Sequence, residues 1–554
     1  QQQQCSPRDI NQPPTYTKIM LLTLLLTIAA LGSNDACVVL QGISSSSSSS
    51  GDDGGLDLAT MQDSLSMEPF DFTNPVIPTI AACSSGLETP ISMRMLLVID
   101  STAFSVSSMF RPAPALDLFG EGEHRRCTPD EADKDLFDLH LRAAVVYGAA
   151  HAAIQAMPYC TELTALMEER GHPLSLLEGY QSTDTPWGIA KTYVDEINAF
   201  FTAHDGWNAD GSMGGRQANL VPFSGDFSIE DSKGNKWKGY TPKNTPYKAR
   251  KTKGERWDRW QPLLESDGLG YITAQEHVTP HIGVTGRFFG FQTAEEEASF
   301  ASRKLDKPSY KKRFYKSASR DVLEESRLAA TDPLKQFAIS FFDNKVTSLV
   351  PLKMAYFLDR QDSTDAMDFY EITIKVQLAI YNSVVLVWRE KIRHDAPRPP
   401  SVIKRKLGDE LVETYAGPDL GVATIKAEEW QPFIRTMPHS EYPSASACLC
   451  EAYAEQIRLW LDGEDEIDPP IQFPPPEYGD PIVTFSRWSE LSGMCGDSRI
   501  WGGMHFEGAI PAGAELCGEG MAESISASID ALLDGDASAA VFKADIGEIM
   551  VRPL

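Results

Sequence analysis

The feature that most constrains this fold is a series of long segments in which apolar residues recur every three to four positions. Phe369, Ile372 and Val376, for example, fall on one face of a helix. The only strand-like alternation of note is Met95–Ile99. We therefore predict a mainly α protein. The segments with helical spacing are Leu136–Met157, Trp187–Thr202, Val322–Phe357, Ala366–Arg393, Ala445–Leu461 and Ala512–Leu533.

Composition and charge exclude two classes of protein. Of the 554 residues, 42% are apolar and ten are Trp, which argues against a wholly disordered chain. The 50 Lys and Arg against 78 Asp and Glu give a net charge of −28. Such a surface repels phosphate backbones, so we expect no nucleic-acid partner. An anion-binding site must then be a local basic cluster.

The N-terminal residues suggest secretion. Ile19–Leu31 is an apolar run of 13 residues, which fits a signal peptide and is too short to cross a bilayer. We assign residues 1–32 to a signal peptide, or to a mis-extended N-terminus, because the chain begins QQQQ and its first methionine is Met20. A buried N-terminal helix is the alternative. We expect a secreted protein without a stable membrane span.

Two further units follow from composition. Residues 33–87 contain the run Ser44–Ser50 and an acidic, glycine-containing stretch, and we predict a low-complexity flexible lead-in. Residues 88–554 form the predicted helical catalytic domain. Within it, the stretch 205–320 is rich in Gly, Pro, Trp and basic residues, and we interpret it as a solvated insertion between helices.

The cysteine count permits disulfides without giving their connectivity. Cleavage after Gly32 leaves eight of the nine cysteines, an even number for a secreted chain. Their spacings match no zinc-binding template, since Cys448 and Cys450 are separated by one residue. We expect structural cysteines or buried thiols.

Three short stretches in the last third of the chain offer groups that hold a tetrahedral oxyanion. The first pairs Lys391 with Arg398-Pro399, which combines a point charge with a planar guanidinium. In the second, Pro443-Ser444 opens an amphipathic segment, so a hydroxyl and the free N–H groups of a helix start face a bound anion. The third places Arg499 six residues before His505, with two glycines between them that let the backbone approach closely.

These residues resemble the vanadium-dependent haloperoxidases, which share their site with type-2 phosphatidic acid phosphatases and bacterial acid phosphatases. The family pattern is Lys, six residues, Arg-Pro; then Pro-Ser-Gly-His; then Ser-Arg, five residues, His. This chain has Lys391 with Arg398, then Ser444-Ala445-Ser446, then Arg499 with His505, in the same order. The resemblance covers most of residues 88–554 and implies packed four-helix bundles.

The resemblance implies vanadate as the cofactor, with His505 as its one metal ligand. Lys391 would also polarise the peroxide. The partners would be hydrogen peroxide, a halide (bromide, iodide or chloride) and small organic nucleophiles, and a homo-oligomer and a monomer both fit the sequence. The residues expected to hold vanadate are Lys391, Arg398, Ser444, Ala445 and Arg499.

The second motif departs from the family at two positions. Ala445 replaces glycine and still offers its N–H group, whereas Ser446 replaces the acid/base histidine and cannot exchange protons near neutral pH. His439, four residues before Pro443, and His394 in the first motif are the candidates to take over that role beside Ser446. Because of this change, an acid phosphatase and a non-catalytic phosphate- or vanadate-binding homologue stay open as alternatives.

Overall fold

The computed structural model describes most of the chain from residue 79 onward. The described residues are 79–80, 82–84, 87–111, 114–122, 134–169, 186–207, 229–230, 233–237, 239–246, 256–266, 270–306, 312–358, 360, 366–473, 482–518, 520–543 and 552. The predicted signal peptide, most of the predicted lead-in, Cys37 and Cys127 lie outside them.

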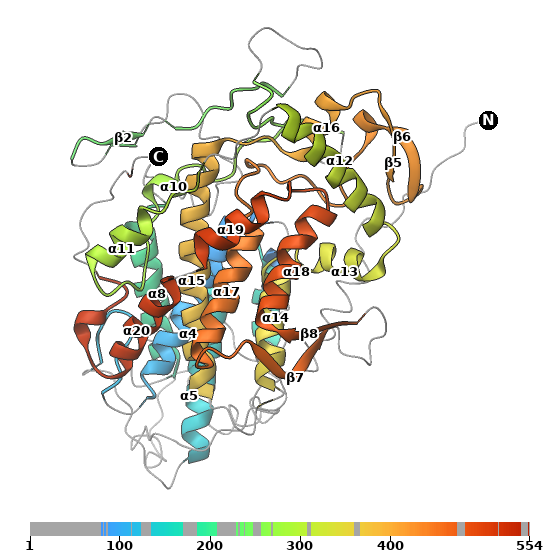
Figure 1. Cartoon of the computed structure of the whole chain (residues 1–554). Helices are drawn as coiled ribbons and strands as arrows, with labels where there is room; N and C mark the ends of the chain where they lie inside the picture. The colour runs from blue at the N-terminus through green and yellow to red at the C-terminus, as the bar shows by residue number, and fades with distance from the viewer. Residues whose placement is uncertain are drawn as a thin grey trace, which may run out of the picture.

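The described chain is mainly helical, which confirms the predicted fold class (Figure 1). The α-helices are α4 Thr89–Ser108, α5 Lys134–Ala156, α6 Thr161–Glu169, α8 Pro186–His204, α10 Ile282–Thr285, α11 Ala294–Ala301, α12 Lys312–Ala329, α13 Pro333–Phe341, α14 Val346–Leu358, α15 Ala366–His394, α16 Pro399–Lys406, α17 Ala445–Trp460, α18 Trp488–Trp501, α19 Ala509–Cys517 and α20 Met521–Leu533. Two short 3₁₀ helices are η1 Ala427–Glu429 and η3 Ala537–Ala539.

The strands of the described chain form only short antiparallel pairs, β1 with β2, β3 with β4, β5 with β6 and β7 with β8. The β7–β8 pair adds Ile467, Ile471, Phe473, Val483 and Phe485 to the main core, and helices supply most of the rest. Their bounds are β1 Ile229–Glu230, β2 Lys236–Trp237, β3 Leu264–Ser266, β4 Ile272–Ala274, β5 Leu411–Tyr415, β6 Val422–Lys426, β7 Glu466–Phe473 and β8 Val483–Arg487.

Helix α15 is the common element of two helix bundles (Figure 1). On one side it packs with α4, and α4, α5 and α8 pack on one another. On the other side it packs with α17, which contacts α18, α19 and α20. From Ile372 to Lys391 every residue of α15 is buried, because the helix is surrounded by apolar side chains. Its C-terminal end, with Lys391, lies at the start of the first sequence motif.

By length and composition alone, α15 resembles a membrane-spanning helix. Met367–Lys406 is long and apolar enough to cross a bilayer, but 94% of its most apolar window is buried inside the protein. Burial of that kind is what a core helix shows when neighbouring helices cover all of its faces.

The predicted strand at Met95–Ile99 is wrong, because these residues lie inside α4. Seventeen of the twenty residues of α4 are buried. A helix that is apolar on all faces loses its 3.6-residue periodicity, and a short run of it then resembles a strand. The segment Val322–Phe357 in turn divides into α12, α13 and α14, and the Asp332 carboxylate caps α13 by accepting from the Leu334 N–H at 3.0 Å.

The interpretation of residues 205–320 as a solvated insertion fits the exposed residues 233–236 and 270–273 but not the buried aromatic residues of this stretch. Trp207 and Trp260 are fully buried, and the Trp207 indole donates to the Tyr381 hydroxyl on α15 at 2.9 Å. The Tyr240 hydroxyl donates to Asp395 at 2.7 Å, directly after α15. Aromatic residues in this stretch therefore cover the end of α15. The basic residues of the stretch had suggested that more of it is exposed to solvent.

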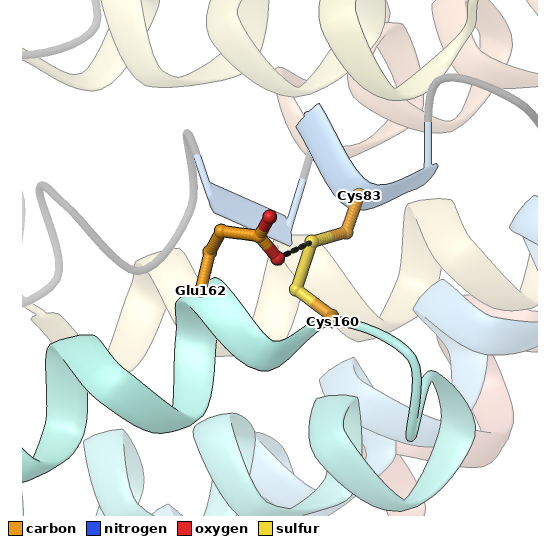
Figure 2. A group of neighbouring side chains, drawn as sticks. All are labelled: Cys83, Cys160 and Glu162. Atoms are coloured by element: carbon orange, nitrogen blue, oxygen red, sulfur yellow. Dashed lines mark hydrogen bonds between the residues drawn. A yellow bond between two sulfur atoms is a disulfide. The ribbon is translucent and has the colours of Figure 1, made fainter.

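Six cysteines form three disulfides, Cys83–Cys160, Cys448–Cys517 and Cys450–Cys495. The last two tie α17 to α19 and α18. Figure 2 shows the first, with a Glu162 carboxylate oxygen 4.0 Å from the Cys83 sulfur. Because both sulfurs are in the disulfide, this group is a crosslink and not a metal site. It also links Cys83, which lies within the predicted lead-in, to Cys160, directly before α6.

Two helical glycines provide a matched test of how closely α19 packs on the start of α17. A Cβ on Gly513 would lie 2.3 Å from the Ser444 carbonyl oxygen, whereas a Cβ on Gly493 of α18 would meet nothing within 4 Å. We expect Gly513→Ala to lower the free energy of unfolding by about 1–3 kcal/mol because of overpacking. Gly493→Ala should raise it by about 0.5–1 kcal/mol because alanine favours helix. Chemical denaturation measures both, and equal effects of the two variants would contradict this packing.

Candidate functional site: a buried cationic cluster

The structure brings the three sequence motifs together around the Arg398 guanidinium. Arg398 is the N-cap residue of α16 and is 1% exposed. Its Nε donates to the His439 carbonyl at 3.0 Å and one terminal nitrogen to the Met504 carbonyl at 2.8 Å. The same terminal nitrogen lies 3.3 Å from His505 Nε2. The predicted residues Arg398, His439 and His505 therefore share one buried site.

Lys391 lies in the same cluster, on the last turn of α15, and it is fully buried. Its ammonium donates to the carbonyls of Ser440, Glu441 and Pro443 at 3.0, 3.1 and 2.6 Å. An ammonium has three N–H donors, so these bonds use all of them. Lys391 thus fixes the loop before α17 and contributes positive charge to the site.

The start of α17 presents unpaired donors. Ser444 is its N-cap, and the Ser444 hydroxyl accepts from the Ala447 N–H at 3.3 Å, which leaves the hydroxyl proton available to donate. The N–H groups of Ala445 and Ser446 have no acceptor among the described residues, as expected at a helix start. Ala445 is buried and Ser446 is partly exposed. Helix starts of this kind bind anions.

His505 is held in one tautomer by a residue that the sequence reasoning missed. The Glu441 carboxylate oxygen Oε1 lies 3.1 Å from His505 Nδ1 and accepts from the Phe506 N–H at 3.0 Å. Nδ1 therefore carries the proton, and Nε2 keeps its lone pair on the side of Arg398. Burial, followed by Arg398 and Lys391, lowers the pKa of His505 well below its ordinary value. A neutral imidazole whose Nε2 keeps its lone pair is what a metal ligand requires, and here that lone pair faces an Arg398 N–H at 3.3 Å.

Arg499 completes the predicted set from the last turn of α18, and it is 3% exposed. Its guanidinium donates to the Ile339 carbonyl at 2.8 Å and pairs with Asp343 at 3.3 Å. Burial lowers the pKa of Arg499, and Asp343 opposes that shift. These contacts anchor Arg499 to α13 and the residues that follow it.

A fourth basic group, Lys345, was also missed, because it belongs to none of the motifs. It is 4% exposed, and its ammonium donates to the Phe342 carbonyl. Burial and the nearby Arg499 lower the pKa of Lys345 well below its ordinary value. Its charge also lowers the pKa of His505, which places it near the imidazole.

The cluster has more basic than acidic groups. Among the described residues, the acids whose charge reaches it most directly are Glu441, which is fully buried, and Asp343, whose side chain is 36% exposed. Burial raises the pKa of Glu441 to about 7, so this carboxyl is only partly ionised at neutral pH. Burial without a full set of counter-charges is costly. These two acids stand against four buried basic groups, Lys345, Lys391, Arg398 and Arg499. A tetrahedral oxyanion would supply the missing negative charge.

The two candidate acid/base residues differ in their surroundings. The His439 ring lies beside the Trp388 ring, tilted by 48° with 4.9 Å between centroids, and its Nδ1 lies 3.0 Å from an Arg398 nitrogen. Burial, then Lys391 and Arg398, lower the pKa of His439 well below its ordinary value, so this imidazole is neutral. Ser446 points from the second position of α17, and no described residue is bonded to its hydroxyl. His394 instead faces Glu390 and Tyr442, outside the cluster.

The loop before His505 makes the close approach predicted for its glycines. Gly503 has φ of 79°, and a Cβ there would lie 2.7 Å from the Trp430 ring. The neighbouring Gly502 carbonyl accepts from the Phe433 N–H at 3.2 Å. The third motif is therefore packed against the segment around Trp430, which forms one wall of a cavity of about 1130 Å³.

Comparisons with known proteins show which folds this chain resembles. The family model for the VCPO second helical-bundle domain matches residues 371–535. The apo-type structure of a bacterial vanadium-dependent chloroperoxidase is 21% identical, with a TM-score of 0.64, and the match covers 81% of this chain and 96% of that one. Its holo-type structure gives the same identity, score and coverage of this chain, with 94% of its own chain covered.

A bacterial vanadium-dependent iodoperoxidase is 16% identical with a TM-score of 0.52, over 82% of this chain and 95% of that chain. No curated protein matches the sequence. The chain has the fold of the vanadium haloperoxidases and carries a VCPO second helical-bundle domain. The resemblance drawn from the three motifs is thereby confirmed.

Lys345 tests whether the cluster is built for an anion. We expect Lys345→Met to weaken the binding of inorganic phosphate about tenfold, because one charge of the cluster is lost. The free energy of unfolding should stay equal or rise, because an underpaired buried charge is removed at similar volume. Calorimetric titration and denaturation measure the two effects. Lys353→Met, at a buried lysine bonded to Thr373 on α15, is the control and should leave phosphate binding unchanged. Unchanged phosphate affinity in Lys345→Met would contradict the assignment.

Proposed function

We propose that this protein is a vanadate-dependent peroxidase, which oxidises halide with hydrogen peroxide to hypohalous acid that halogenates organic compounds. The observation that carries the proposal is the neutral His505 imidazole. Its Nδ1 faces Glu441, and its Nε2 points into a cluster of buried basic groups. An imidazole ligand beside anion-binding groups suits a metal oxyanion. The fold and the helical-bundle domain support the same conclusion.

The donor set fits vanadate. His505 Nε2 would be the protein ligand, with the charges of Lys391, Arg398 and Arg499 around the oxyanion. The Ser444 hydroxyl proton and the N–H groups of Ala445 and Ser446 are unpaired donors at the start of α17. When bound, vanadate would supply a Lewis acid that makes hydrogen peroxide reactive toward halide.

The protein residues have three separate tasks. Glu441 keeps the proton on His505 Nδ1, which keeps Nε2 a ligand. Arg398 and Arg499 are buried and would stabilise the negative charge of a bound oxyanion, where low polarity strengthens such interactions. Lys391 adds charge, but its three donors hold the loop before α17, so polarising the peroxide would require it to release one carbonyl.

Proton transfer falls to His439 or to solvent at Ser446. His439 is neutral and lies within the cluster, 3.0 Å from Arg398. Because burial, Lys391 and Arg398 lower its pKa, it would accept a proton only once negative charge is bound beside it. Ser446 is partly exposed, and its hydroxyl donates a hydrogen bond without titrating near neutral pH. A serine at position 446, where the family has histidine, also favours the second candidate function, a binder of phosphate or vanadate without turnover.

The experiment that tests the proposal is a bromination assay on the full chain, with and without added orthovanadate. Activity that needs bromide, peroxide and vanadate together, and that phosphate inhibits, supports the peroxidase. Vanadate binding without turnover would select the silent binder instead. Release of phosphate from a chromogenic ester would indicate a phosphatase.

The role of His505 gives a direct mutational test. We expect His505→Ala to weaken vanadate binding by at least about 100-fold, because the ligand atom is lost. Equilibrium dialysis with vanadium analysis measures the affinity. His204→Ala, at the end of α8 and away from the cluster, is the matched control and should bind as the parent does. Stoichiometric binding by His505→Ala would contradict the assigned ligand.

Ser446 allows a gain-of-function test. We expect Ser446→His to raise turnover by about tenfold or more, because an acid/base group enters the site at the start of α17. The initial rate of bromination measures this, and vanadate affinity measured alongside separates turnover from binding. A rate equal to or below that of the parent would show that His439 or solvent already moves the proton.

We also propose that the protein works in an oxidising compartment. The three disulfides support this, since such crosslinks persist in secreted proteins and are rare in the cytosol. Mass spectrometry of the natural protein, with and without alkylation, would detect free thiols at these six positions if the compartment were reducing.

A further inference from the structure

The cavity beside the cationic cluster has the features of an organic binding site. Its volume is about 1130 Å³, at the upper end of small-molecule sites and much more than a halide or a peroxide occupies. Its aromatic walls come from Trp257, Trp430 and Phe433, with Leu263 and several prolines between them. The residues that line it do not include the oxyanion-binding groups, so the cavity is a neighbouring space.

Three contacts join the cavity to the cluster. One wall is α16, and the N-cap of this helix is Arg398. A second wall contains Trp430, whose ring lies against Gly503, two residues before His505. A third contains Arg259, which donates to the His394 carbonyl at 2.8 Å, between Lys391 and Arg398 in the chain. A ligand in the cavity would therefore lie next to the loops that carry Arg398 and His505.

The charged residues of the cavity walls exceed neutrality by one basic group, with Arg259, Lys404, Arg405 and Arg435 against Glu265, Glu428 and Glu429. Arg435 is already paired with Glu265 and Glu88. Lys404 of α16 is exposed, and within the described part of the chain it makes no ion pair or hydrogen bond. An unpaired cation at the edge of aromatic walls suits a flat ring that bears an acidic substituent.

We propose that this cavity binds the organic substrate, an electron-rich aromatic compound of the phenol class with a carboxylate or similarly acidic group that pairs with Lys404. The assignment rests on the proposed function. Hydrogen peroxide, halide and a proton would give hypohalous acid and water. The ring carbon would then form a bond to the halogen, the halogen–oxygen bond would break, and the ring proton would leave to form water with the hydroxide.

Direct binding tests the proposal without any turnover. The probes are a naphthol and the hydroxynaphthoate that adds one carboxylate to the same ring, titrated into the full chain without peroxide and followed by their fluorescence. We expect saturable binding of both compounds, with the hydroxynaphthoate about three- to fivefold tighter, as befits one exposed ion pair. Binding that does not saturate for either probe would overturn the proposal.

Two variants assign the site. Lys404→Gln should remove the preference for the hydroxynaphthoate and leave naphthol binding unchanged. Lys304→Gln, at an exposed lysine outside the cavity lining, is the matched control and should bind both probes as the parent does. Trp257→Leu should weaken both probes about tenfold, because an aromatic wall is lost. A preference for the hydroxynaphthoate that survives in Lys404→Gln would overturn the role of that residue.

The same variants separate this inference from the proposed function. Iodide oxidation, measured as triiodide without any organic compound, reports on the cationic cluster alone. If the parent oxidises no halide, the proposed function fails, while probe binding still reports on the cavity. If the parent oxidises halide but binds neither probe, the cavity assignment fails and the peroxidase stands. A thermal melt confirms that Trp257→Leu is folded before its affinity is interpreted.

Discussion

The structure depends on one electrostatic constraint, the burial of four basic side chains with too little negative charge beside them. Lys391 and Arg398 are at most 1% exposed, and Lys345 and Arg499 at most 4%. Their burial lowers the pKa of every one of them. A protein retains such an arrangement where binding compensates for it, because breaking or underpairing buried charges costs several kcal/mol. The negative charge of a bound oxyanion attracts each of these groups and so offsets the repulsion among them.

The helices hold this cluster in place from several directions. Helix α15 brings Lys391 to its end, and Asp395 then takes a φ of 51° before Arg398 caps α16. Gly513 of α19 lets the chain pass close to the Ser444 carbonyl, and two disulfides tie α17 to α18 and α19. The site therefore lies where both the bundle contacts and the crosslinks converge, which suits a rigid, preorganised anion site.

Local sequence predicted those parts of the site that its own motifs contain. Pro443-Ser444 was predicted to open a helix, and Ser444 is the N-cap of α17. For Arg398-Pro399 the sequence showed the groups that meet an anion, whereas its place at the start of α16 came only from the structure. Glu441 and Lys345 were missed, because their roles depend on residues far away in the sequence: Glu441 reaches His505, and the charge of Arg499 lowers the pKa of Lys345. The strand predicted at Met95–Ile99 failed for a related reason, since complete burial of α4 erases the periodicity that distinguishes a helix.

The most direct test of the account is the melting temperature of the full chain as a function of orthovanadate concentration, with sulfate at equal ionic strength as the control. If the buried basic cluster is completed by a bound oxyanion, the melting temperature must rise with the logarithm of vanadate above the dissociation constant, and phosphate must compete. A melting temperature that does not respond to vanadate, or that responds equally to sulfate, would contradict the central claim that this cluster is a specific oxyanion site.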